Sequence, residues 1–129
     1  MIFNQTSLKG AYIIEPELIE DERGYFTRTF CPREFERMGI SFCPVLTNIS
    51  YNRKRGTLRG MHYQRPPYQE AKLVSCIRGS LYDVIIDLRA ESETYCKRTA
   101  VELNSKDHLL LYVPPDFAHG FITLEDDTA

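Results

Sequence analysis

Short runs of hydrophobic and β-branched residues alternate with turn residues along most of this chain, a pattern that predicts strands. The runs recur too closely for crossover helices to fit between them, so an all-β fold is expected. The expected strands are residues 12–15, 25–30, 45–51, 57–63, 71–78, 81–89, 99–103, 109–113 and 120–124. One short helix is expected at 32–38, because Pro32 suits a first helical turn and Gly39 supplies a stop.

The clearest local pattern is a pair of strands, 72–78 and 81–89, separated by Gly79 and Ser80. A two-residue turn of this kind predicts an antiparallel hairpin with a fixed register. One face of that hairpin would carry Lys72, Val74, Cys76, Asp83, Ile85 and Asp87, and the other Leu73, Ile77, Tyr82, Val84, Ile86 and Leu88. The second face suits a sandwich core. For the first, a pocket lining and a solvated face with surface ion pairs both remain open.

The length of 129 residues fits one domain, since a chain of this size buries roughly two-thirds of its unfolded surface. A net charge of −2 gives no global attraction to nucleic acid or anionic membranes. The sequence also contains no apolar stretch long enough for a membrane span and no signal-peptide pattern at its start, so a cytoplasmic protein is expected. Its four unevenly spaced cysteines are expected to be free thiols, with two disulfides as the alternative.

Candidate chemistry gathers in the polar run 52–67, which has four basic residues between Arg53 and Arg59. Such a loop suits either a receptor for phosphate or pyrophosphate, or an edge loop made soluble by charge. His62, in the following strand, suits a general base or a structural role. His119 is expected to face a pocket mouth or to bond to backbone, and His108 to lie in a solvated loop.

Three ordered segments carry a family resemblance: Asp21-Glu-Arg-Gly-Tyr-Phe26, Gly56-Thr-Leu-Arg-Gly-Met-His-Tyr-Gln64 and Pro114-Pro-Asp-Phe-Ala-His-Gly-Phe-Ile-Thr-Leu124. With these, the chain resembles the dTDP-4-dehydrorhamnose 3,5-epimerase family over essentially its whole length. The resemblance implies a cupin-like double-stranded β-helix, or jelly roll. It also implies an isomerase of rhamnose-type deoxysugar biosynthesis that acts on a dTDP-4-keto-6-deoxyhexose. Neither a metal nor a redox cofactor is implied.

The resemblance also assigns roles to individual residues. His62 would remove a proton from the sugar carbon beside the ketone, and Lys72 would stabilise the enolate oxygen that forms. Asp83 would be a pocket residue that orients Lys72 or balances its charge. The positions expected to bind substrate are Arg23, Phe26, Arg28, Asn48, Arg59, Lys72 and His119, with Arg59 on the pyrophosphate. In this family the Arg23 segment crosses a dimer interface, so a homodimer is implied.

The chain departs from the family pattern at several positions. The family places a tyrosine acid, and then an aspartate that pairs with the catalytic histidine, beyond the point where this sequence reaches Ala129. A single jelly-roll domain over 1–129 without the family's C-terminal segment is therefore expected. Arg28 stands where a glutamate is usual, and Leu46 where a glutamine is common. Strict alternation sends Arg59 and His62 to opposite faces of their strand, and a bulge at Gly60 would bring them to the same face.

Three other functions stay open. A metal-dependent cupin needs two or three histidines and a carboxylate around one ion, whereas here only His119 could join His62. A sugar 3,4-ketoisomerase of the same superfamily suits the chain length, but its members have a second histidine where this chain has Gln64. A non-catalytic or truncated domain that binds a sugar nucleotide is the third.

Overall fold

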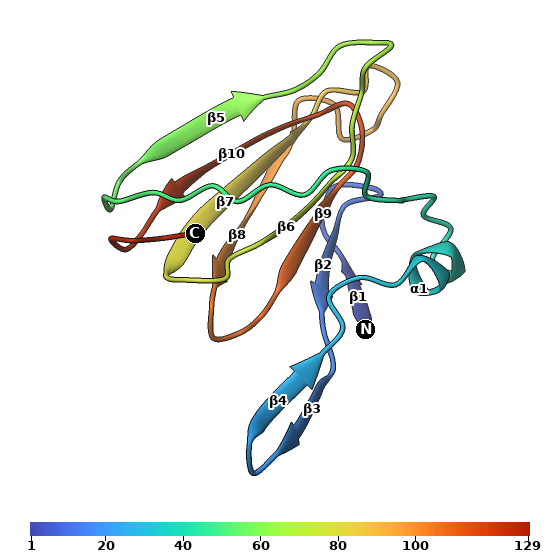
Figure 1. Ribbon diagram of the computed structural model, residues 1–129. Helices are drawn as coiled ribbons and strands as arrows, with labels where there is room; N and C mark the ends of the chain where they lie inside the picture. The colour runs from blue at the N-terminus through green and yellow to red at the C-terminus, as the bar shows by residue number, and fades with distance from the viewer.

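The computed structural model describes all 129 residues, which fold into two facing antiparallel sheets and one short helix (Figure 1). The first sheet has the order β1-β2-β9-β6 and the second the order β5-β10-β7-β8, while β3 and β4 pair only with each other. The strands are β1 Ile2–Gln5, β2 Tyr12–Glu15, β3 Leu18–Asp21, β4 Gly24–Thr27, β5 Leu58–His62, β6 Lys72–Ser75, β7 Ser80–Asp87, β8 Arg98–Asn104, β9 Leu110–Val113 and β10 Phe117–Thr123. The helix α1 is Pro32–Arg37. These paired sheets confirm the jelly-roll fold.

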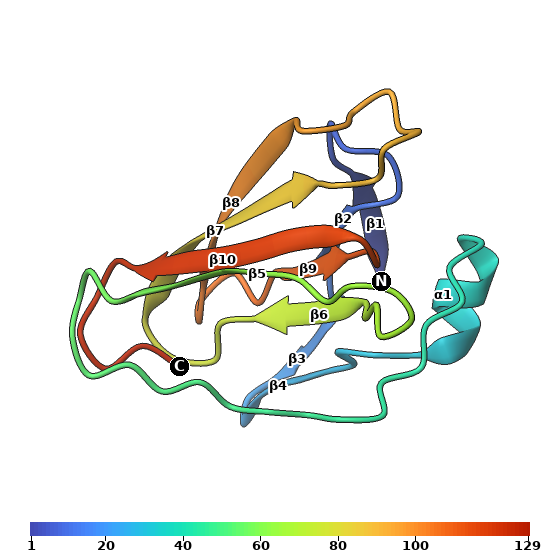
Figure 2. The same cartoon turned by 90° about the horizontal axis from the view of Figure 1, so that it is seen from above.

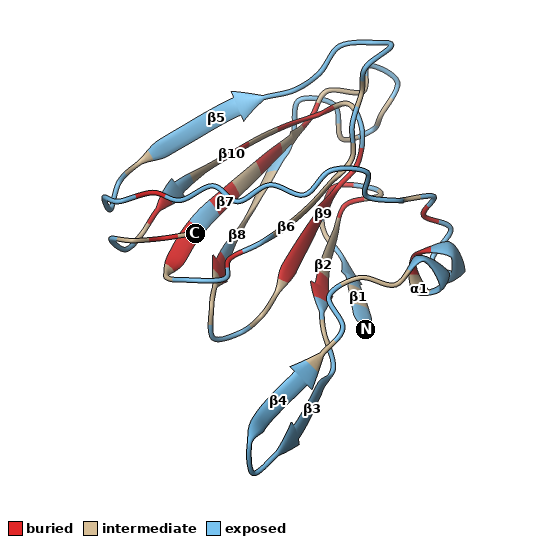
Figure 3. Ribbon diagram, viewed as in Figure 1, coloured by how far each residue is buried: buried red, intermediate tan, exposed pale blue.

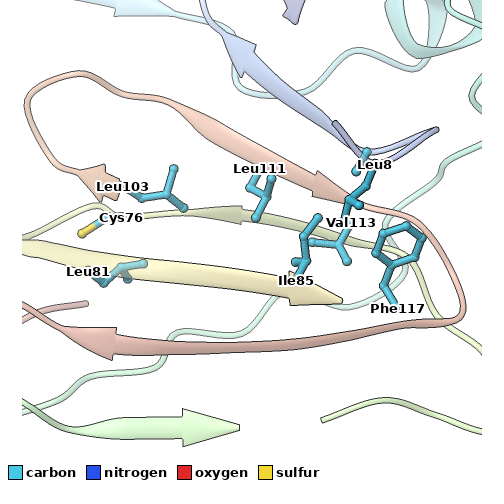
Figure 4. Packing of buried hydrophobic residues seen from close by; sticks show 9 residues of the cluster. Leu8, Cys76, Leu81, Ile85, Leu103, Leu111, Val113 and Phe117 are labelled. Carbon is cyan, nitrogen blue, oxygen red and sulfur yellow. The ribbon is translucent and has the colours of Figure 1, made fainter. Parts of the chain in front are cut away.

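The space between the sheets holds the main hydrophobic core (Figure 4). Its nine members come from both sheets, from the loop before β2 and from the segment after β6: Leu8, Ala11, Cys76, Leu81, Ile85, Leu103, Leu111, Val113 and Phe117. Colouring by burial shows β9 in the protected interior, while β5 and the β3–β4 pair are exposed (Figure 3). The core therefore lies towards β7, β8 and β9, and the edge strand β5 contributes no residue to it.

Helix α1 covers the outer face of the first sheet. Its Phe35 is fully buried in a second cluster that includes Ile14, Leu110 and Tyr112 from β2 and β9. Pro32 begins the helix, and Gly39 follows it with φ +72°, as the sequence predicted. At six residues, the only helix is far too short to cross a bilayer.

The predicted hairpin of 72–78 and 81–89 is wrong. Strand β6 pairs with β9 in one sheet, whereas β7 pairs with β8 and β10 in the other. The residues between them cross from sheet to sheet, and the backbone N–H groups of Ile77 and Arg78 donate to the carbonyl of Ala129. Since those donors are satisfied by the end of the chain, the Gly79 turn does not close a ladder between β6 and β7.

That crossing reverses the predicted faces of β7. Leu81, Asp83, Ile85 and Asp87 point into the molecule and are buried, while Tyr82 is on the outer face and 45% exposed. Two further expectations are corrected: 45–51 forms no strand, and β1 and β3 were not predicted. In the view from above, the segment that follows α1 runs along the outside of the sheets before it turns into β5 (Figure 2).

Candidate active site

Strand β10 brings two histidines side by side on the inward face of the second sheet. His119 is opposite His62 of β5 on one side and opposite Ile85 of β7 on the other. Directly opposed residues on paired strands project from the same face of a sheet. His62 and His119 therefore lie on the same sheet face as the fully buried Ile85, but His62, on the edge strand β5, is solvent-exposed.

Arg59 reaches the same face through an irregularity in β5. It pairs with Phe121, which in turn pairs with the buried Asp83. From Arg59 to His62 the chain advances three residues on β5 but only two on β10, so a bulge separates them. The expectation of a bulge at Gly60 is therefore confirmed, and Arg59 and His62 share one face.

Lys72 lies on the inner face of the other sheet. It lies opposite Val113 on β9, and Val113 belongs to the core between the sheets. Its ammonium forms an ion pair with Glu70, which holds the pKa of that carboxyl below its ordinary value. Sequence reasoning missed Glu70, because nothing in the pattern linked it to the lysine two residues later.

Asp83 has a different partner from the one expected. One of its carboxylate oxygens, Oδ2, lies 2.9 Å from Nε2 of His119. Its other oxygen, Oδ1, is buried without any hydrogen-bond partner. Burial raises the pKa of the Asp83 carboxyl, while the contact with His119 opposes that rise. Asp83 is thus fully buried on the inward face of β7, and the side chain it contacts is His119 rather than Lys72.

A buried amide fixes the Arg59 guanidinium. Its Nε donates a hydrogen bond of 2.7 Å to Oδ1 of Asn52, a residue only 3% exposed. The sequence placed Asn52 at the start of the basic run but offered no signal that it is buried. This contact is the second one missed from the sequence.

The other predicted substrate-binding residues do not join this group within one chain. Arg23 and Phe26 belong to the β3–β4 hairpin, which projects away from the sheets (Figure 1). Arg28, just after β4, lies 3.5 Å from Glu34 of α1, and Asn48 is exposed in the segment before β5.

A hollow of about 400 Å³ lies where the segments after β5 and β7 meet, and His62 is not among the residues that line it. Tyr63, which follows the histidine, lines it together with Gln64, Arg89 and Asp116. No group of three or more His, Cys, Asp or Glu side chains is arranged to hold a metal ion.

Comparison with known proteins gives consistent matches. The family model described as dTDP-4-dehydrorhamnose 3,5-epimerase matches residues 5–129. An enzyme of that name from Methanothermobacter thermautotrophicus is 46% identical over 125 residues, covering 97% of this chain and 66% of the relative. The chain thus spans just under two-thirds of that relative's length.

Two solved structures share the fold closely. The dTDP-4-dehydrorhamnose 3,5-epimerase from Elizabethkingia anophelis superimposes with a TM-score of 0.95 at 45% identity, covering 99% of this chain and 70% of that one. The corresponding protein from Bacillus anthracis, with TDP and PPi bound, gives 0.93 at 38% identity, covering 98% and 73%.

Proposed function

Because this chain belongs to the dTDP-4-dehydrorhamnose 3,5-epimerase family, we propose that it epimerises a dTDP-4-keto-6-deoxyhexose at C3, C5 or both. The reaction removes a proton from a carbon beside the ketone and returns one to the opposite face of the ring. The observation that supports the proposal is the strand register, which puts His62 and Lys72 on the facing sides of the two sheets.

The two side chains match the two needs of the chemistry. A carbon beside a ketone is acidic because its conjugate base is an enolate, so the reaction needs a base at the carbon and a cation at the oxygen. Neutral His62 accepts the proton, and the Lys72 ammonium stabilises the negative charge that develops on the C4 oxygen. The Glu70 carboxylate keeps that ammonium from extending freely into solvent.

Arg59 and His119 bind the charged part of the substrate in this proposal. A guanidinium offers a planar set of donors that fits phosphate oxygens. Both residues share the inward face with His62, so a diphosphate bound there would hold the sugar near the base. Asn48, exposed in the segment before β5, is a further substrate contact in this proposal.

Inversion requires an acid on the other side of the ring. His62 and His119 are neighbours on one sheet face, so they approach a bound sugar from the same side. The second proton therefore comes from a group outside the β5–β10 face.

Deuterium exchange tests the proposal. The chain, incubated with dTDP-4-keto-6-deoxyglucose in deuterated water, is expected to place deuterium at C3 or C5 with inversion, measured by NMR. His62→Ala should slow exchange at least ~100-fold. It should change the thermal midpoint little, because His62 is exposed. His108→Ala is the matched control, since that histidine lies in a loop between β8 and β9.

The outcomes separate the alternatives. Exchange without inversion would mean that the base works while the second acid is not supplied by these 129 residues. Absence of exchange despite measurable binding of the nucleotide sugar would contradict the enzymatic proposal and favour a non-catalytic binding domain.

A homodimer is the second part of the proposal, with the hairpin of one copy reaching the site of the other. Ile19 and Phe26 pair on one face of the β3–β4 hairpin and are each 68% exposed. A two-stranded hairpin is marginal alone and gains stability when such a face is covered. Arg23, near its tip, pairs only with Asp21 and stays available to a partner's ligand.

Sedimentation equilibrium tests this assembly. The wild-type chain should be dimeric, and Ile19→Ser with Phe26→Ser should shift it to monomer. Val45→Ser, which replaces an apolar residue that is 88% exposed outside the hairpin, should remain dimeric. A monomeric wild type would contradict the proposal.

We assign the protein to the cytoplasm, where its four free cysteines would stay reduced.

A further inference from the structure

Asn52 is a buried residue, and both the nitrogen and the oxygen of its side-chain amide form hydrogen bonds. Its Nδ2 donates to the carbonyl oxygens of Ser50, at 3.1 Å, and Thr128, at 3.3 Å. Its Oδ1 accepts the hydrogen bond from Arg59 Nε at 2.7 Å. Since the amide nitrogen faces two carbonyls, turning the amide over would lose three hydrogen bonds, and the oxygen is directed at Arg59.

The backbone around Asn52 is equally constrained. Its N–H donates to the carbonyl of Thr128 at 2.8 Å, and the N–H of Thr128 donates back at 3.0 Å. Thr128 is itself fully buried, and its hydroxyl contacts the carbonyls of Ser80 and Glu125. Hydrogen bonds through Thr128 thus connect Asn52, which accepts the hydrogen bond from Arg59, to the start of β7 and to residues 125–128.

The contact with Asn52 occupies only one of the three guanidinium nitrogens of Arg59. Arg59 uses Nε for Asn52, and its two terminal nitrogens make no hydrogen bond or ion pair within the chain. The two terminal nitrogens can donate hydrogen bonds to two oxygens of one anion. Fixing Nε removes much of the freedom of a long side chain before any ligand arrives.

We propose that Asn52 is a positioning residue for anion binding: its amide oxygen orients Arg59 so that the guanidinium presents its terminal nitrogens to the diphosphate of a nucleotide sugar. The inference rests on the proposed function for the identity of the ligand. A neutral amide suits this task better than a carboxylate, because it accepts the same hydrogen bond without neutralising the positive charge.

Binding of dTDP, measured by calorimetry, tests the role. Asn52→Ala should weaken dTDP about tenfold, the effect of losing one hydrogen bond to a charged group. Thymidine, which has no phosphate, should bind the variant and the wild type equally. In deuterium-exchange kinetics KM should rise while kcat changes little, because Asn52 does not touch the reacting carbon.

A double-mutant cycle with Arg59→Met separates positioning from a general structural effect. If Asn52 acts through Arg59, adding Asn52→Ala to Arg59→Met should change dTDP affinity less than about twofold. Thr128→Val is the control: it removes the hydroxyl contacts and lowers stability, keeps the backbone bridge to Asn52, and should bind dTDP like the wild type. Independent, additive effects of the two substitutions, or an equal loss in Thr128→Val, would overturn the inference.

A measurement without ligand distinguishes this inference from the proposed function. The Arg59 Nε proton should exchange slowly with solvent in ¹H–¹⁵N spectra of the wild type and rapidly in Asn52→Ala. Slow exchange in a wild type that binds no dTDP would uphold the positioning of Arg59 and contradict the proposed substrate. Equal exchange in both proteins would overturn the positioning itself.

Discussion

Gly60 is the residue that allows Arg59 and His62 to face the same interior. Its φ is +121°, a region that side-chain-bearing residues avoid. A Cβ there would lie 2.6 Å from the Cα of Gly120 and 2.9 Å from the carbonyl oxygen of His119. The bulge and the close approach of β5 to β10 therefore both require a glycine at position 60.

Replacing this glycine should damage stability and the site together. Gly60→Ala should lower the free energy of unfolding by about 2 kcal/mol or more, from backbone strain and the clash with β10. It should also slow deuterium exchange, because β5 must move away from His119. Urea denaturation measures the first effect and NMR the second.

Gly24→Ala is the matched control for that experiment. Gly24 has φ +128°, but nothing lies within 4 Å of its would-be Cβ. The control bears a similar backbone cost without the clash. Equal destabilisation by the two substitutions would contradict the role given to the contact with Gly120.

At the scale of elements, α1 supports the sheet that carries Lys72. The ring of Phe35 lies 5.1 to 5.8 Å from those of Phe3, Phe30, Phe42 and Tyr112. The helix is too short to be stable alone, so this aromatic cluster holds it against β2 and β9.

Truncating the centre of the cluster should be costly. Phe35→Ala is expected to lower the free energy of unfolding by about 3–5 kcal/mol, because it removes a fully buried aromatic ring. Met38→Ala, at a residue 42% exposed just after the helix, should cost less than about 1 kcal/mol. Urea denaturation compares them, and similar midpoints would mean that the helix does not depend on the cluster.

Across the whole molecule, Asp87 joins parts of the chain that are distant in sequence. Its fully buried carboxylate accepts hydrogen bonds from Arg89, Ser92 and Thr94. Arg89 also donates to the carbonyl of Lys9 and lies 4.7 Å above the ring of Phe117. The network therefore ties the loop before β2 to the end of β7 and the start of β10.

This network predicts a pH dependence of stability. Burial acts to raise the pKa of Asp87, but the hydrogen bonds from Arg89, Thr94 and Ser92 outweigh it and hold the pKa well below its ordinary value. Folding then favours the charged form. The stabilisation is complete above the unfolded pKa of about 4 and is lost as pH falls from there towards the lowered folded pKa.

Asp87→Asn should therefore lose about 3 kcal/mol at pH 7. Between pH 4 and 2 its free energy of unfolding should fall less steeply than that of the wild type, in urea titrations at each pH. Glu93→Gln, at an exposed residue, is the control and should keep the wild-type slope. Equal slopes in Asp87→Asn and wild type would contradict the linkage.

The sequence by itself determined the strand-rich class, the helix start at Pro32 and the motifs around His62 and His119, because these depend on local periodicity and residue type. It also indicated the Gly60 bulge, since only a bulge puts Arg59 and His62 on one face. The partners of Asp83, Lys72 and Arg59 were decided by the tertiary structure. A hairpin between β6 and β7 satisfies the same local pattern as two strands in separate sheets. What separates the two is long-range: the backbone donors after β6 bind Ala129, and β9 and β10 arrive from later in the chain to pair with β6 and β7.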